Sequence, residues 1–224
     1  MAGLAGFDYY YETPASPPVG LASEAITNPR IVIMQLAKRL GIIVGALALT
    51  GGLAATAHAQ IGTGWSSTSV SYSTQVSSGC YNSGGYFRLD GGSGRSERRY
   101  ATLTSGSRQF QGTFVMDSLG GDRVSVFQTF SEANGPWQMG AVKKPGTLYE
   151  VEGGATLSSY SIGSSMRINT IATSGGSVTV YVNGSQKESK SGGPSPYNKL
   201  GAYATASGAG PAEVHWSSIQ FWKK

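Results

Sequence analysis

Apolar and polar positions alternate in short segments from about residue 60 to the C-terminus. Side chains that are apolar at every second position are typical of β-strands with one buried face. Clusters of Gly, Asn, Asp, Pro and Ser separate these segments, as expected of tight turns. The pattern predicts strands at residues 66–74, 86–89, 95–102, 109–116, 123–130, 137–142, 147–151, 166–173, 177–182, 199–205 and 213–222.

Gly-rich turns are expected between these strands, at residues 90–92, 120–122, 145–146, 174–176, 183–184 and 207–208. Many short strands joined by such turns indicate a sandwich or a barrel, and no convincing amphipathic helix follows residue 60. Residues 60–85 are Ser-rich and poor in large aliphatic side chains, so we expect a loose edge strand or a short linker there. Residues 86–224 then make up the body of a single all-β domain.

The N-terminal part of the chain carries the features of an export signal. Lys38 and Arg39 precede an apolar run at residues 40–57, and Ala-His-Ala follows it, ending at Ala59. A basic region, a short apolar region and a small-x-small site are together typical of a secretory signal peptide. A membrane anchor, the alternative, needs about 20 mostly apolar residues. Because the uninterrupted run covers only residues 40–49, we predict cleavage near Ala59, secretion to the extracellular space or the periplasm, and no membrane attachment afterwards.

Residues 1–33 fit no part of such a signal, because they hold four prolines and an aromatic run, whereas a signal peptide starts shortly before its positive charges. Met34 lies four residues before Lys38. We therefore expect translation to begin at Met34, with residues 1–33 a mis-called start or a disordered extension and residues 34–59 the signal peptide. The mature chain would have about 165 residues, which suits one domain.

Charge and composition narrow the classes of ligand. The formal net charge is +5, a modest positive balance that favours an anionic ligand. Nucleic acid is disfavoured, because the basic cluster Arg95, Arg98 and Arg99 is short and no nucleic-acid motif is present. Cys80 is the only cysteine and His215 the only histidine of the predicted mature chain, so we expect neither an intrachain disulfide nor a zinc site.

The segment at residues 95–99 is the first candidate for chemistry. On a strand, Arg95, Glu97 and Arg99 point the same way. Two guanidiniums flanking a carboxylate could make an anion clamp, in which Glu97 fixes the arginine rotamers and the guanidinium forks stay free for a ligand carboxylate. The alternative is an exposed salt-bridge ladder on a solvated sheet face.

Two further strands carry polar groups at spacings of interest. Gln128 is expected to share a strand face with Val124, Val126 and Phe130, where its amide needs hydrogen-bond partners, either a ligand or the protein itself. In the segment at residues 197–203, alternation puts Tyr197, Lys199, Gly201 and Tyr203 on one face. The glycine would let a ligand or another backbone approach closely, and nearby cations can lower the pKa of a tyrosine; the alternative is ordinary aromatic packing.

Together these three segments resemble the alginate-lyase-2 group, that is, polysaccharide lyase family 7 and its relatives. The family's first motif, R-S/T-E-L-R, matches residues 95–99 in all but Leu, where Arg98 stands. Its second, Q-I/V-H, keeps only the Gln at residues 128–130, and its third, Y-F-K-A-G-x-Y-N-Q, keeps both Tyr, the Lys and the Gly at residues 197–203. The resemblance implies a concanavalin-like β-jelly-roll sandwich of two antiparallel sheets.

The resemblance also implies a reaction, because this family cleaves uronic-acid polysaccharides such as alginate or glucuronan by β-elimination. By similarity, Arg99 and Gln128 would hold the substrate carboxylate, and Tyr203 would act as base, acid or both. The other substrate-binding residues would be Arg95, Glu97, Lys199, Tyr197 and Phe130. The implied partner is an acidic polysaccharide or oligosaccharide, and we expect no cofactor, no metal and a monomer.

One departure from the family leaves the activity open. Phe130 stands where the family has histidine, and loss of a positioned general base commonly costs about 10²–10⁴ in rate. The chain would be a lyase that relies on Tyr203, or a non-catalytic binder of an acidic glycan or of a polycarboxylate such as citrate, since it is also similar to plant citrate-binding proteins. A structural surface protein is a third alternative, and a glycosidase pair made by Glu150 and Glu152 on one strand face is a remote one.

Overall fold

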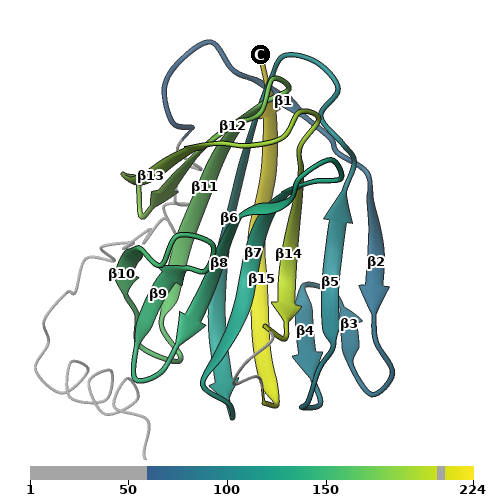
Figure 1. Ribbon diagram of the computed structural model, residues 1–224, viewed down its shortest axis with the longest axis vertical. Helices are drawn as coiled ribbons and strands as arrows, with labels where there is room; N and C mark the ends of the chain where they lie inside the picture. Colours follow the sequence, from purple (N-terminus) through teal and green to yellow (C-terminus); the bar gives the residue numbers. More distant parts are fainter. Residues whose placement is uncertain (1–59, 206–209) are drawn as a thin grey trace, which may run out of the picture. The chain divides into compact units, whose positions relative to one another are not determined.

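The structure is a computed structural model that describes residues 60–205 and 210–224 (Figure 1). The predicted signal peptide and the segment before it lie outside the described residues, as does the predicted turn at residues 207–208. The described part of the chain is all β. It contains no helix that is long and apolar enough to cross a membrane.

Fifteen strands make up the described part of the chain. They are β1 (Ser66–Thr68), β2 (Tyr72–Val76), β3 (Tyr81–Ser83), β4 (Tyr86–Leu89), β5 (Arg95–Tyr100), β6 (Ser107–Leu119), β7 (Arg123–Ser131), β8 (Gly135–Lys143), β9 (Thr147–Glu150), β10 (Thr156–Ser159), β11 (Ser165–Thr173), β12 (Ser177–Val182), β13 (Ser185–Ser191), β14 (Tyr197–Tyr203) and β15 (Ala212–Lys223).

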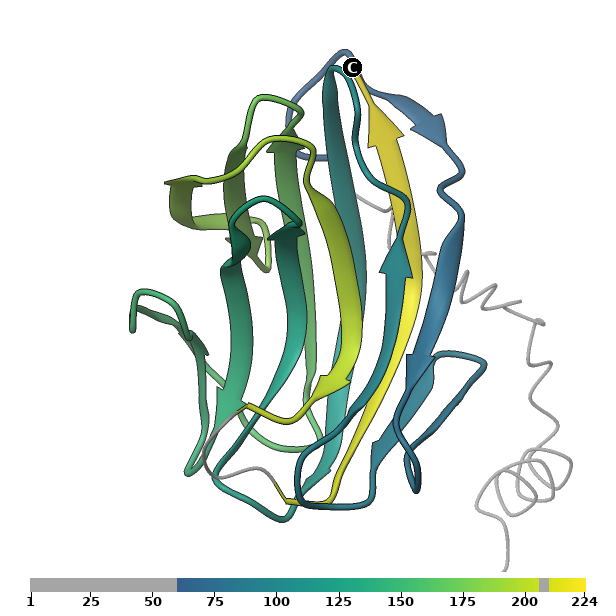
Figure 2. The same ribbon diagram turned by 45° about the vertical axis from the view of Figure 1, so that its right-hand side comes forward.

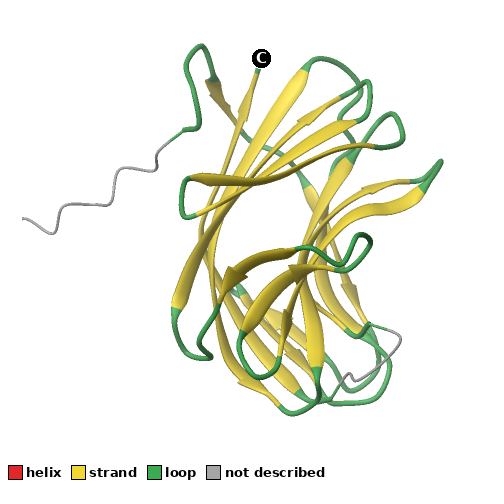
Figure 3. Cartoon of the chain, turned by 60° about the vertical axis from the view of Figure 1, so that its left-hand side comes forward, coloured by secondary structure: helices red, strands yellow, loops and turns green. Residues whose placement is uncertain are grey.

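The strands form two antiparallel sheets that pack face to face as a jelly-roll sandwich (Figures 2 and 3). The eight-stranded sheet has the order β13-β12-β11-β6-β15-β4-β3, with β1 paired to β15. The seven-stranded sheet has the order β10-β9-β8-β7-β14-β5-β2. The sandwich of two antiparallel sheets expected from the motifs is therefore confirmed.

Alternating apolar residues of both sheets build the core between them. Phe110, Phe114 and Met116 of β6 point inward from the eight-stranded sheet, and Phe127 and Leu200 meet them from the seven-stranded one. Each of these side chains is almost fully buried, and burial of one such side chain contributes roughly 1.5–3 kcal/mol. The apolar residues at every second position of a strand thus decide which of its faces is buried.

The strand predictions succeed where one face is apolar. Residues 86–89 and 177–182 form β4 and β12 with the predicted bounds. The predicted strand at residues 66–74 is instead two strands, β1 and β2, with β2 at the edge of the seven-stranded sheet. Strands β3, β10 and β13 were not predicted; each lies at the end of a sheet, and their sequences YNS, TLSS and SQKESKS carry almost no apolar alternation.

Candidate active site

Strand β14 holds the centre of the predicted site. It runs between β7 and β5, and the pairing puts Lys199 opposite Gln128 on one side and Arg99 on the other. Four residues further along β14, Tyr203 lies opposite Arg95. Because residues directly opposite each other in an antiparallel pair share a face, these five side chains all stand on one side of the sheet.

The same pairing adds the other predicted residues to this side. Tyr197 pairs with Phe130, and Glu97 pairs with Gly201. Leu200 and Ala202, the alternate residues of β14, belong to the core. The side of the seven-stranded sheet that faces away from the core is called the site face from here on, and its members are Arg95, Glu97, Arg99, Gln128, Phe130, Tyr197, Lys199 and Tyr203. Four of them, Glu97, Gln128, Tyr197 and Lys199, are buried.

The sequence prediction for the neighbours of Gln128 is wrong. The register between β7 and β8 shifts between Ser125 and Phe127, which marks a β-bulge. Val124, Val126 and Phe127 all belong to the core, although the last two are consecutive. Gln128 therefore shares the site face with Phe130 but not with the two valines.

Gly201 is needed for a close approach of backbone. Its φ is +138°, and a Cβ there would lie 2.2 Å from the carbonyl oxygen of Ser96 and 2.8 Å from a ring carbon of Phe87. No L side chain fits this conformation and this space without a shift of the backbone. The sequence left open whether Gly201 lets a ligand or another backbone approach. In the structure it is the backbone of strand β5 that comes close.

Glu97 is the buried polar centre of the site face. Its side chain is only 2% exposed, Gln128 Nε2 donates a 2.7 Å hydrogen bond to its Oε1, and Lys199 Nζ lies 3.6 Å from its Oε2. The predicted clamp, in which Glu97 fixes Arg95 and Arg99, is therefore wrong in its contacts. Alternation correctly gives the shared face, but the amide and the ammonium of neighbouring strands are the direct partners of the carboxylate.

Burial shifts the titration of this pair. The pKa of Glu97 is raised, because desolvation of the carboxylate outweighs the attraction of Lys199 and Arg95. The pKa of Lys199 is lowered, mainly by burial and against the attraction of Glu97, with the positive charges of Arg95 and Arg99 adding to the effect. Burial therefore destabilises the charged form of both members of this ion pair.

The two arginines of the site face stack on its two tyrosines. The Arg95 guanidinium carbon lies 5.4 Å from the ring centre of Tyr203, and that of Arg99 lies 4.1 Å from the ring centre of Tyr197. These are cation–π distances, and stacking leaves the planar edge of a guanidinium available to an anion. Arg99 uses its edge to bind the carboxylate of Glu132.

The two tyrosines differ in what they can do chemically. Tyr197 is only 3% exposed, packs on Phe130 with ring centres 5.2 Å apart, and has its pKa raised by burial. A phenol with a raised pKa is a poor base near neutral pH. Tyr203, at the end of β14, is only partly buried and lies beside Arg95. Tyr203 is therefore the better placed of the two to meet a substrate.

The site face is extended along β14. Tyr203 is four residues from Lys199, which is about 13 Å at the rise of a β-strand. Arg95 and Tyr203 lie at one end, whereas Arg99, Gln128 and Phe130 surround Lys199 towards the other. The charged and aromatic groups of the site face are therefore spread over the length of the strand rather than gathered at one point.

Sequence reasoning missed Glu132, which pairs with Arg99 from the turn between β7 and β8. No periodicity marks a turn residue, and its position two residues after Phe130 is the one sequence signal that could have drawn attention to it. Among the described residues, no group of three or more His, Cys, Asp and Glu side chains is close enough to hold a metal ion.

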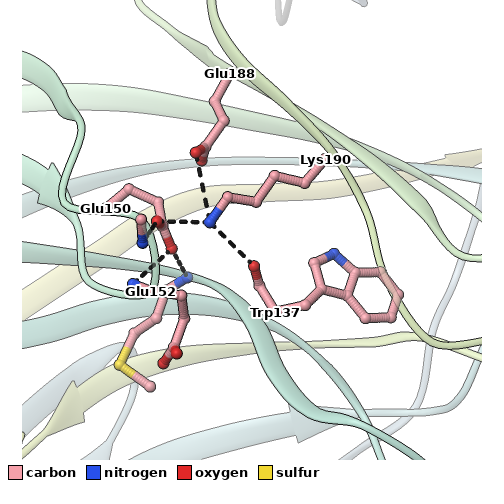
Figure 4. A network of polar contacts seen from close by, with 7 residues as sticks. Trp137, Glu150, Glu152, Glu188 and Lys190 are labelled. Atoms are coloured by element: carbon pink, nitrogen blue, oxygen red, sulfur yellow. Dashed lines mark hydrogen bonds and ion pairs between the residues drawn. The ribbon is translucent and has the colours of Figure 1, made fainter.

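The remote glycosidase alternative is wrong. Strand β9 ends at Glu150, and Glu152 lies in the following turn, so the two do not share a strand face. Glu150 is completely buried and accepts hydrogen bonds from the backbone N–H of Met139 (3.2 Å) and Glu152 (3.0 Å) and from that of Gly153. Lys190 Nζ lies 2.6 Å from its Oε2 (Figure 4). The carboxylate of Glu150 therefore has a structural role.

Solved structures of alginate lyases share this fold, although no family model and no curated protein matches the chain. An alginate lyase of polysaccharide lyase family 7 has a TM-score of 0.50 at 19% identity, over 61% of this chain and 76% of that one. The enzyme from Corynebacterium sp. has a TM-score of 0.52 at 19% identity, over 61% and 75%. The enzyme from Alteromonas sp. 272 has a TM-score of 0.51 at 12% identity, over 67% and 92%. At these identities the comparison shows the fold.

Proposed function

We propose that this protein is an exported polysaccharide lyase that cleaves a uronic-acid polysaccharide, of the alginate or glucuronan type, by β-elimination. The observation that carries the proposal is the neighbouring pair of Arg95 and Tyr203 on the site face. A positive net charge and the fold shared with alginate lyases support it. The elongated site face supports a polymeric substrate.

Elimination needs a neutralised carboxylate, a base and an acid. The C5–H bond breaks, its electron pair forms the C4=C5 double bond, and the C4–O4 bond breaks while the departing O4 takes a proton. In this proposal a guanidinium binds the uronate carboxylate, which acidifies the C5 proton. Tyr203 removes that proton and returns it to O4, so one residue serves a syn-elimination.

The pairing of strands changes which arginine we assign to the reacting sugar. Arg95 lies opposite Tyr203, whereas Arg99 lies about four residues away along the neighbouring strand. We therefore assign the carboxylate of the reacting unit to Arg95, and that of a neighbouring unit to Arg99. Gln128 donates to Glu97, so its role is to hold the buried centre of the site.

The test is the appearance of the unsaturated uronate, followed by its ultraviolet absorbance, after mixing the protein with a panel of polyuronates. Tyr203→Phe removes the hydroxyl and is expected to lower the rate by about 10²–10⁴-fold. Tyr81→Phe is the matched control, because Tyr81 is 49% exposed and belongs to the other sheet. Full activity of Tyr203→Phe would contradict the assignment of Tyr203.

A non-catalytic binder of acidic glycans or polycarboxylates is the second candidate function. The observation that favours it is Phe130, which brings no titratable group to the site and instead packs on Tyr197, with Lys199 Nζ 5.1 Å from its ring centre. Tight binding of a polyuronate or of citrate without any rise in absorbance would favour this candidate over the lyase. Failure to bind any polyanion would leave only the structural surface protein.

A further inference from the structure

The carboxylate of Glu132 occupies the guanidinium edge of Arg99. Glu132 lies in the turn between β7 and β8 and is 70% exposed, whereas Arg99 is 30% exposed and is fixed from below by stacking on Tyr197. The acidic partner is thus the more solvated member of the pair. A substrate carboxylate that approaches Arg99 meets the same chemical group already bound there.

The ion pair stands between two surface depressions. One, of about 330 Å³, is lined by Arg99 and by the hydroxyl side chains of Ser71, Ser73 and Thr102. The other, of about 250 Å³, is lined by Glu132 and again by Thr102. Hydroxyl groups at such a surface suit the hydroxyl groups of sugars. Thr102 lines both depressions, so they are neighbours, with Arg99 at one and Glu132 at the other.

Exposed ion pairs are weak, typically about 0–1 kcal/mol, because solvent screens them and long side chains lose freedom. Glu132 can therefore be displaced, yet it competes with every incoming anion. A competitor of that strength lowers the apparent affinity of Arg99 for an external carboxylate by up to about fivefold.

We propose that Glu132 is a built-in competitor for the carboxylate site at Arg99, and that a uronate unit displaces it when an acidic polysaccharide extends along the site face as far as Arg99. The inference rests on the proposed function, since it takes an acidic glycan as the ligand. Its effect is to reserve Arg99 for ligands that bind at several points at once, and to reject small isolated anions.

Glu132→Gln tests the proposal, because it keeps the shape of the side chain and removes its charge. Calorimetric titration with an oligouronate is expected to show binding two- to fivefold tighter than in the wild type. Asp90→Asn is the matched control: Asp90 is also exposed, lies 4.0 Å from Arg88, and directly follows β4 of the other sheet. Both substitutions remove one negative charge, so a general charge effect would appear in both.

Two further measurements identify Arg99 as the group that is released. Arg99→Met in the Glu132→Gln background should abolish the gain, and an oligosaccharide whose carboxyl groups are reduced to alcohols should bind both proteins equally. A gain shared by Asp90→Asn, or unchanged or weaker binding by Glu132→Gln, overturns the inference. Binding of the oligouronate by the wild type would in that case still support the proposed function. Absence of binding by the wild type and by both variants overturns the two together.

Discussion

Phe130 is the residue of the site face at which this chain departs from the histidine of the family that it resembles. Its ring lies against Tyr197 and near Lys199, on the strand next to the one that carries Tyr203. The family that this chain resembles has a histidine there. An imidazole is smaller than a phenyl ring, so it fits the space, and it adds a group that titrates near neutral pH.

We expect Phe130→His to raise the elimination rate by about tenfold or more, since a positioned general base commonly contributes about 10²–10⁴-fold. The measurement is the initial rate of absorbance increase with a polyuronate at pH 6–8. Phe130→Leu removes the ring without adding a base and should show no gain. An equal change in both variants would mean that space, and not a base, limits the reaction.

Glu97 gives a prediction about pH. Its pKa is raised in the folded protein by burial, so the folded state binds its proton more tightly than the unfolded state does. The stability from this group is present below the unfolded pKa, near 4.5, and is lost as the pH rises through the folded value. The wild type should therefore lose stability relative to Glu97→Gln over that window, by at most about 1.4 kcal/mol per pH unit.

Denaturant unfolding of both proteins at a series of pH values from 4 to 7 measures this difference. The slope against pH is the readout, because a glutamine at this position cannot titrate, whereas the attraction of Lys199 for the ionised carboxylate is already part of the folded pKa of Glu97. Asp90→Asn, which removes an exposed carboxylate outside the site face, serves as the control. A flat difference between Glu97→Gln and the wild type would show that burial does not govern this carboxyl.

At the residue scale, alternation in the sequence predicted the faces but not the partners. Arg95, Glu97 and Arg99 do share a face, yet Glu97 binds Gln128 and Lys199 from the two other strands of the site. Those partners depend on the register between strands far apart in the chain. A period of two contains no information about that register.

At the element scale, β5 and β14 approach so closely that one position admits only glycine. Gly201→Ala would push a methyl group into the Ser96 carbonyl at a φ of +138°. We expect a loss of more than about 2 kcal/mol in the free energy of unfolding. Gly175→Ala is the control, since nothing lies within 4 Å of its added Cβ, and it should change stability little. Thermal and urea unfolding compare the two, and equal losses would contradict this account.

Strand edges and bulges limited what the sequence predicted at this scale. Inner strands such as β12 alternate clearly, because one face is buried against the other sheet. Edge strands such as β13 have seven mostly polar residues and a single neighbour, so no pattern marks them. The bulge in β7 shifted the alternation by one residue, which placed Val124 and Val126 on the wrong side of Gln128 in the prediction.

At the scale of the whole molecule, a largely buried ion cluster joins the edge strand β13 of one sheet to β8 and β9 of the other. Lys190 of β13 binds Glu150 of β9 and lies 3.5 Å from Glu188, and its Nζ donates to the carbonyl oxygen of Trp137 on β8 (Figure 4). β13 belongs to the eight-stranded sheet and β8 and β9 to the seven-stranded one. The edge strand with the weakest hydrophobic pattern is thus tied to the opposite sheet by charge.

Removal of the central cation should therefore loosen the sandwich at this edge. Lys190→Met leaves the carboxylate of Glu150 completely buried without its counter-ion, and breaking a buried pair costs about 3 kcal/mol. Lys187→Met, at an exposed position of the same strand, should cost little. Burial and Glu150 raise the pKa of Glu188, so acidification towards pH 4 neutralises this carboxyl and should shrink the loss in Lys190→Met. Urea unfolding at pH 7 and pH 4 measures both effects, and an equal loss for the two lysines would mean that packing alone, without the ion cluster, holds β13 to the opposite sheet.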